Sequence, residues 1–264
     1  MKRDEITKIG IEVAKFLREK KDSSDIAKII ATHEDDVTRK IDKESEEYIF
    51  ELMRETGYKF KFISEEAGTV EDSGYEYKAI IDPIDGSTNF VSGIPWSSVS
   101  IAVYRSDENN LLQSVTGVIT NIFTMDTFSY DEKNSYINDK VVQNIRKSEK
   151  TLILAYFSRS KFETVKEFLS QVKDYKLRSL GSASLDMVLV CMGKATMFFD
   201  IRGKLRNVDI AASSNFCNRL GINPHDKKLE NINSSLEKVS TLSEVIVSLD
   251  QNLSSYLSSA LKKV

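Results

Sequence analysis

The chain contains 264 residues, with 37 Lys and Arg against 40 Asp and Glu, a formal net charge of −3 and 41% hydrophobic residues. This composition is typical of a globular protein with one large domain or two coupled ones, and it lacks the concentrated basic patch of a nucleic-acid-binding protein. Residues 1–21 have no apolar signal core, and no run approaches the roughly 20 apolar residues of a membrane span. We therefore expect a cytoplasmic protein that binds neither nucleic acid nor membrane.

Periodicity predicts the elements of the first third of the chain. In order, they are a helix near residues 6–17, a charged loop at 33–38, a second helix near 41–53, and strands at 59–63 and 79–81. The strand at 59–63 leads to Glu65 and Glu66. The apolar run 79–81 predicts a buried strand that Pro83 and Gly86 should end.

The rest of the chain alternates between strand and helix patterns. Short alternating segments predict strands near residues 99–103, 115–119, 128–130, 136–137, 152–157 and 195–199. Helices are expected near residues 164–172, 185–192, 210–220 and 253–261. The polar stretch 143–150 is the best boundary, so we expect an N-terminal α+β lobe over residues 1–145 and a C-terminal α/β lobe over residues 146–264.

The two cysteines, Cys191 and Cys217, both lie in apolar segments with helical spacing. Free cysteine is among the most buried residue types, and two such residues do not define a disulfide framework. We therefore expect two reduced, buried thiols.

The most informative stretch is residues 78–90, Lys-Ala-Ile-Ile-Asp-Pro-Ile-Asp-Gly-Ser-Thr-Asn-Phe. Asp82 and Asp85 follow a buried strand, and the residues after Gly86 are types that begin helices, whose free N–H groups attract anions. Two carboxylates in this position repel each other unless a cation lies between them, and hard oxygen ligands suit Mg²⁺ together with a substrate phosphate. Alone, the motif is more typical of a strand, a tight turn and a helix cap without chemistry, because short motifs often occur by chance.

The stretch Asp82-Pro83-Ile84-Asp85-Gly86-Ser87-Thr88-Asn89, with Glu65-Glu66 upstream and Val208-Asp209-Ile210-Ala211-Ala212 downstream, resembles the inositol monophosphatase family. Members of that family are Mg²⁺-dependent, Li⁺-sensitive phosphomonoesterases, and archaeal members also act on fructose 1,6-bisphosphate. The motifs occur in the family's order, so the resemblance spans nearly the whole chain. It implies a sugar-phosphatase-like sandwich of alternating α-β-α-β-α layers and a homodimer.

The resemblance also implies roles for individual residues. Glu65, Asp82 and the Ile84 carbonyl would hold one Mg²⁺, and Asp82, Asp85 and Asp209 would hold a second, with a third ion or a substitution by Mn²⁺ possible. Ser87, backed by Asp42 at the start of the second helix, would orient the attacking water, with Glu65 also counted as catalytic. The N–H groups of Gly86, Ser87 and Thr88 would hold the phosphate. Asp85, directly before Gly86, is also counted among the substrate-binding residues.

The chain departs from the family pattern at four positions. Ser64 stands for Gly, Ser87 for Thr, Val208 for Trp and Ser213 for Gly. Ser87 keeps the hydroxyl, and positions 208 and 213 are packing positions.

Substrate contacts are expected from the C-terminal half. The turn Gly181-Ser182-Ala183-Ser184 begins a helix and is suited to an anion, although simple capping explains it equally well. We place Ser182 and Ala183 in the substrate site.

Further along, Asp200 could accept hydrogen bonds from the hydroxyls of inositol 1-phosphate, whereas Arg202, Lys204 and Arg206 could meet the second phosphate of fructose 1,6-bisphosphate. Three spaced cations at the end of a strand more often form a plain surface. We rank inositol 1-phosphate first, fructose 1,6-bisphosphate second or concurrent, and adenosine 3′,5′-bisphosphate third.

Other mechanisms fit less well. An aspartyl-phosphate phosphatase needs Asp-x-Asp-x-Thr, but position 84 is Ile, and no Gly-Lys-Ser/Thr of a P-loop occurs. A non-catalytic relative that binds a sugar phosphate is a further alternative. The presence of an acid at every position that matches a family metal ligand argues against it.

Overall fold

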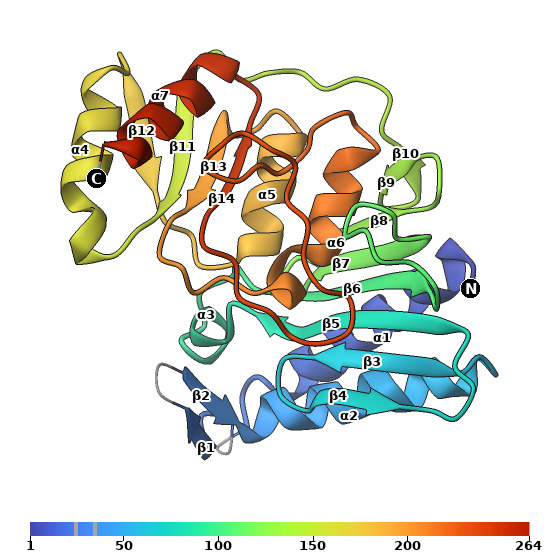
Figure 1. The fold of residues 1–264 in the computed structure, drawn as a ribbon. Coiled ribbons are helices and arrows are strands. Elements are labelled where there is room, and N and C mark those ends of the chain that lie inside the picture. Colours follow the sequence, from blue (N-terminus) through green and yellow to red (C-terminus); the bar gives the residue numbers. More distant parts are fainter. Residues whose placement is uncertain (24–25, 34–35, 264) are drawn as a thin grey trace.

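The structure is a computed structural model that describes residues 1–23, 26–33 and 36–263. Helices and sheets alternate in five layers, which confirms the predicted α-β-α-β-α sandwich (Figure 1). The first layer contains α1 (Arg3–Lys20) and α2 (Lys40–Glu55), the middle layer α5 (Ala183–Cys191) and α6 (Asn207–Asn218), and the last α4 (Phe162–Ser170) and α7 (Gln251–Lys262). Two sheets separate these helical layers.

The larger sheet has eight strands in the order β10-β9-β8-β7-β6-β5-β3-β4. In chain order they are β3 (Phe60–Ser64), β4 (Gly68–Glu71), β5 (Tyr77–Asp85), β6 (Ser98–Arg105), β7 (Thr116–Asn121), β8 (Thr127–Tyr130), β9 (Ser135–Ile137) and β10 (Lys140–Val141). Only β3 and β5 pair in parallel, with Ser64 opposite Ile81. Their carboxyl ends therefore meet at one edge of the sheet.

Both faces of this sheet are covered, so its central strands are apolar on both sides. Ile80 and Ala102 pack with α5 and α6, whereas Ile81 and Val103 pack with α1 and α2. This side-to-side alternation follows from the two-residue period of a strand.

The smaller sheet has the order β12-β11-β13-β14. Its strands are β11 (Thr151–Tyr156), β12 (Tyr175–Arg178), β13 (Met197–Asp200) and β14 (Val245–Ser248), and a short 3₁₀ turn, η1 (Arg159–Lys161), precedes α4. In sequence, the strands of the larger sheet precede residues 143–150 and those of the smaller sheet follow them. In space, however, one core cluster contains side chains from both parts of the chain. The division into two lobes therefore stays a prediction.

Two sequence expectations on local structure need correction. Within the predicted charged loop 33–38, of which residues 34 and 35 lie outside the described residues, β1 (Ile29–His33) and β2 (Asp36–Arg39) pair as an antiparallel hairpin. The central strand β5 does not end at Pro83 but continues to Asp85, with a shift of register against β6 after Asp82. Proline has no N–H to donate, and such an irregularity in the ladder accommodates it.

The prediction of two free thiols was wrong. Cys191 and Cys217 form a disulfide, with their Cα atoms 5.4 Å apart. Both residues are buried as expected, but α5 and α6 lie side by side between the sheets and bring the two sulfurs together (Figure 1). Across the described ranges, no helix is both long and apolar enough to cross a membrane.

The connection between α6 and β14 fastens the start of α6 to the larger sheet. Glu237 in this connection forms ion pairs with Lys61 of β3 at 2.6 Å and with Lys78 of β5 at 2.5 Å. Lys78 is only 2% exposed. The Asn207 side-chain amide donates hydrogen bonds to the carbonyls of Ser235 (2.7 Å) and Lys238 (3.0 Å). The same connection thus contacts both the strands and the helix start.

We expect Glu237→Gln to lower the free energy of unfolding by about 2–3 kcal/mol, because the buried Lys78 ammonium would lose its counter-charge. Glu71→Gln is the matched control, since Glu71 pairs with Lys61 at 3.5 Å from an exposed position and should cost under about 1 kcal/mol. Urea denaturation measures both. Equal effects of the two variants would contradict the importance of the Lys78 pair.

Candidate active site

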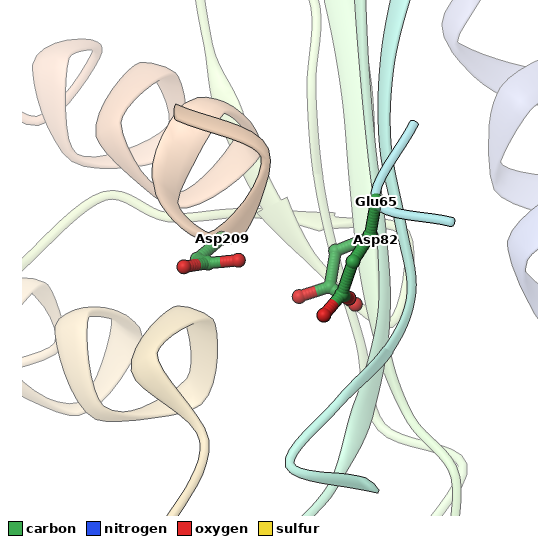
Figure 2. A group of neighbouring side chains, drawn as sticks. All are labelled: Glu65, Asp82 and Asp209. Atoms are coloured by element: carbon green, nitrogen blue, oxygen red, sulfur yellow. The ribbon is translucent and has the colours of Figure 1, made fainter. Parts of the chain in front are cut away.

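Three carboxylates from distant parts of the chain meet at the junction of the large sheet and α6. Glu65 follows β3, Asp82 lies in β5 and Asp209 lies in the first turn of α6, and one oxygen of each lies within 4.8 Å of the others. Figure 2 shows Glu65 and Asp82 projecting from the strand side toward Asp209 on the helix. Asp82 is 2% exposed and Asp209 is 8% exposed.

Local backbone contacts fix each of the two aspartates. The Ile84 N–H donates to Asp82 Oδ1 at 3.1 Å, within the irregular end of β5. The Arg206 N–H donates to Asp209 Oδ2 at 2.7 Å, which caps the start of α6. The orientation of the Ile84 carbonyl as a ligand stays a prediction.

The turn that carries Glu65 is held by a residue that the sequence analysis missed. Glu46 of α2 is buried, and its Oε1 accepts hydrogen bonds from the N–H groups of Glu66 (3.2 Å) and Ala67 (3.1 Å). Glu46 lies four residues after Asp42, so both acids share one face of α2. That spacing was the available signal.

Asp85 lies beside this group, but its carboxylate binds the start of α5. It accepts hydrogen bonds from the Ser182 hydroxyl (2.6 Å) and from the N–H groups of Ala183 (3.0 Å) and Ser184 (2.8 Å). Ser182 also caps the helix by accepting a bond from the Leu185 N–H. The Gly-Ser-Ala-Ser turn therefore caps α5 and binds an anion, which is Asp85 itself.

The predicted phosphate-binding corner contains a second residue that the sequence analysis missed. Ser87 begins α3 (Ser87–Val91), and Arg39 Nη1 donates to its Oγ at 3.0 Å. The Arg39 N–H in turn donates to the buried Asp42 carboxylate at 2.8 Å. Arg39 thus connects Asp42 with Ser87, while the direct pairing of those two residues stays a prediction.

Close packing holds α3 against the segment before α5. Gly86 has φ +86°, and a Cβ there would lie 2.8 Å from the Gly181 carbonyl oxygen, so only glycine fits. The Asn89 amide donates to the carbonyls of Trp96 (2.8 Å) and Leu180 (2.6 Å). Gly86 and Ser87 are partly exposed and Thr88 is exposed, so this turn lies near the surface.

A buried network of hydrogen bonds also holds the segment before α5 in place. Asp186 of α5 accepts hydrogen bonds from the Trp96 indole N–H (2.8 Å) and from the Tyr156 hydroxyl (2.6 Å). The Gly181 N–H donates to that hydroxyl. Trp96, predicted as core, therefore packs partly against the core and also donates a hydrogen bond.

Asp200 and Arg202, both predicted to contact substrate, bind each other. Arg202 Nε and Nη2 donate to Asp200, with distances of 3.0 Å and 2.5 Å to Oδ2. Asp200 is 1% exposed, whereas the guanidinium extends over the Tyr156 ring toward the surface. Of this pair, Arg202 is the group that a substrate can reach.

Burial and mutual repulsion shift the acids of the site in one direction. Burial raises the pKa of Asp209 to about 7, although the neighbouring Arg206 opposes this. Burial also raises the pKa of Asp85 to about 6 against the hydrogen bonds from Ser182 and Ser184. Burial and repulsion from Glu65 raise the pKa of Asp82 well above its usual range. An excess of buried carboxylates with only oxygen donors fits a hard divalent cation.

Comparison with known proteins agrees with this geometry. The model of the inositol monophosphatase family matches residues 3–252. The chain belongs to the inositol monophosphatase family. It is 31% identical over 255 residues to an inositol-1-monophosphatase of Aeropyrum pernix, covering 93% of this chain and 92% of that protein.

A further sequence match and a solved structure each cover nearly all of the chain. It is 27% identical over 256 residues to a fructose-1,6-bisphosphatase/inositol-1-monophosphatase of Methanocaldococcus jannaschii, covering 96% of this chain and 97% of that protein. A crystal structure described as an inositol monophosphatase-fructose 1,6 bisphosphatase superposes with a TM-score of 0.80 at 27% identity, covering 98% of this chain and 100% of that one. The family and the fold inferred from the three motifs are both confirmed.

The positions that depart from the family pattern near Asp209 lie in the core. Val208 and Ser213 are fully buried, and the Ser213 hydroxyl contacts the Ile210 carbonyl within α6 at 3.2 Å and the Met187 sulfur of α5 at 3.3 Å. Both residues therefore occupy packing positions.

We expect the metal-free protein to lose stability as the pH rises through the neutral range. Asp82, Asp85 and Asp209 keep protons in the folded state at pH values where the unfolded chain, with a pKa of about 4, has released them. Their contribution is complete below about pH 4 and is lost through the folded-state values of about 6 and about 7.

Melting temperature in a chelator, measured across this pH range, tests the expectation. Added Mg²⁺ should stabilise the protein more at the alkaline end, because it binds the ionised carboxylates. A metal-free melting temperature that rises from mildly acidic to mildly alkaline pH would contradict it.

Proposed function

We propose that the protein is a phosphoric monoester hydrolase that acts on a phosphorylated polyol or sugar with the help of divalent metal. The observation that carries this proposal is the convergence of Glu65, Asp82 and Asp209, one oxygen of each lying within 4.8 Å of the others. The helix α3 begins at Ser87, two residues after the end of the strand that carries Asp82. Membership of the family and the names of two relatives, both phosphatases, support it.

In this proposal the metal is Mg²⁺, with Mn²⁺ as a substitute, and at least two ions bind. Glu65, Asp82 and the Ile84 carbonyl would hold one, and Asp82, Asp85 and Asp209 would hold the other. Metal held there would supply a lowered pKa for a bound water and charge neutralisation at the leaving oxygen. The fit rests on the all-oxygen donor set and on the raised pKa values of the acids.

The chain's own groups position the reactants. The Ser87 hydroxyl, in contact with Arg39, orients the attacking water, and Asp42 supports it through the backbone of Arg39. The N–H groups of Gly86, Ser87 and Thr88 hold the phosphate oxygens. Asp85 is fixed by three hydrogen bonds from the start of α5, so it stays close to Asp82 and Asp209. No covalent phosphoenzyme forms in this scheme.

We rank inositol 1-phosphate as the first substrate and fructose 1,6-bisphosphate as a second or concurrent one. The relative from Aeropyrum pernix is named for the first activity, and that from Methanocaldococcus jannaschii for both. The reachable guanidinium of Arg202 is the group that would contact a second phosphate.

Phosphate release from inositol 1-phosphate, fructose 1,6-bisphosphate and adenosine 3′,5′-bisphosphate, with and without Mg²⁺ and Li⁺, tests the proposal. Asp82→Asn should lower kcat at least about a hundredfold, because several kcal/mol of charge stabilisation would be lost. The same variant should raise the metal-free melting temperature, since it removes a repelling charge while keeping the acceptor for the Ile84 N–H.

The control for this experiment is Asp72→Asn, which removes a partly exposed acid that pairs with Arg54. It should leave kcat within about twofold of wild type, as expected for a surface pair. Absence of metal-dependent phosphate release from all three substrates would favour the alternative of a relative that binds a sugar phosphate without hydrolysing it.

Arg202→Gln should separate the two leading substrates. Loss of a charged hydrogen bond to the second phosphate should lower kcat/KM for fructose 1,6-bisphosphate by about tenfold or more, and that for inositol 1-phosphate by under about threefold. Lys176→Gln, which changes an exposed cation on β12, an edge strand of the smaller sheet, serves as the control and should affect both substrates little. Equal losses on the two substrates would exclude a second-phosphate role for Arg202.

A further inference from the structure

An arginine lies inside the group of acids. The Arg206 guanidinium forms an ion pair with Glu65 through Nη2, and its Nε lies 3.6 Å from Asp209 Oδ1. Its side chain is 26% exposed, against 16% for Glu65 and 11% for Asp209. One cation thus bridges the strand side and the helix side of the site.

The backbone holds Arg206 in this position. It is the residue directly before α6, and its N–H donates to Asp209 Oδ2 at 2.7 Å. Arg206 and Glu65 are 141 residues apart in sequence, so their contact depends on the packing of α6 against the large sheet. Burial works to lower the pKa of Arg206, but attraction to Asp209 and Glu65 outweighs it and raises the pKa. The guanidinium therefore stays charged, as arginine does throughout proteins.

A divalent ion at this site and the Arg206 guanidinium would bind the same carboxylate oxygens. Glu65 and Asp209 are two of the three acids that converge at the site, and each has Arg206 as a close cation. A metal ion that binds either carboxylate must share it with the guanidinium or displace it, and it meets one positive charge already in place.

We propose that Arg206 is a built-in cation that competes with divalent metal for Glu65 and Asp209 and so weakens and sets the metal affinity of the site. The inference rests on the proposed function only in that the site binds metal. In the absence of metal, the guanidinium offsets the repulsion between Glu65 and Asp209 and holds the two sides of the site together.

A purely structural ion pair makes a different prediction. If Arg206 only fastened α6 to the sheet, its loss would destabilise the protein equally with and without metal, and the looser site would bind metal no better. A competitor gives opposite signs: the metal-free protein becomes less stable, and metal binds more tightly.

Isothermal titration of the metal-stripped protein with Mn²⁺ and Mg²⁺, without substrate, measures the difference. Arg206→Gln should lower the dissociation constant by about tenfold or more, because a unit charge near the ligands is removed. Arg206→Lys, which keeps the charge, should remain within about threefold of wild type. Melting temperature in chelator should fall for Arg206→Gln, and the deficit should shrink at saturating metal.

Arg54→Gln is the matched control. Arg54 also pairs with a carboxylate, Asp72, but this pair lies at the opposite end of β3 from Glu65. Its loss should leave the metal dissociation constant unchanged.

Unchanged or weaker metal binding by Arg206→Gln, with phosphate release by the wild type intact, would overturn the inference alone. Tighter metal binding by the variant, with no phosphate release from any of the three substrates, would support the inference and overturn the proposed function. Should Arg206→Gln fail to fold without metal, the Arg206→Lys titration decides, and a dissociation constant far below that of wild type would refute competition by charge.

Discussion

Glu65, Asp82 and Asp209 bring three ionisable carboxyls into one largely buried space, with Asp85 close beside them. Burial removes water that would stabilise their charges, and their mutual repulsion adds to that cost, so their pKa values rise. Within the described chain, Arg206 and the backbone N–H groups at the starts of α5 and α6 offset part of this repulsion. The remaining repulsion between the carboxylates is the kind that a bound divalent cation offsets.

The acids of the site also stabilise the fold, because they cap helices. Asp42, Asp85 and Asp209 each accept an N–H hydrogen bond at the start of a helix: α2, α5 and α6. Capping of this kind contributes about 1 kcal/mol per helix. Each acid therefore stabilises a helix start, while its buried charge destabilises the folded state. Replacement by Asn keeps the acceptor and removes the charge, which is why Asn variants separate the two effects.

Several long-range connections hold these helix starts in place. The Ser184 hydroxyl of α5 donates to the Asp209 carbonyl of α6 at 2.8 Å, and the disulfide joins the same two helices further along. Glu237 fastens the connection after α6 to Lys78 of β5, the strand that carries Asp82. The acids therefore lie on elements that are connected to one another at several points, which preserves their spacing.

Local pattern determined most of the layers. The period of the apolar residues was enough to predict α1, α2, α7 and the alternating strands of the large sheet, because a helix or strand that is buried on a defined face must repeat its apolar residues at a fixed interval. Buried on nearly every side, α6 and β5 have no such period, and they were predicted from apolar runs with start and stop residues at their ends. The motif around Asp82 and Asp85, with the resemblance that it carries, was enough to indicate the family and to name Glu65 and Asp209 as members of the site.

The tertiary structure decided what depends on contacts between remote segments. Glu46 supports the Glu65 turn from 20 residues away, Arg39 contacts Ser87 from 48, and Arg206 reaches Glu65 across 141. The pairing of Cys191 with Cys217 likewise follows from the packing of α5 on α6. Periodicity reports only which face of an element is buried. Which polar group lies opposite it depends on how the layers stack, and only the folded chain specifies that.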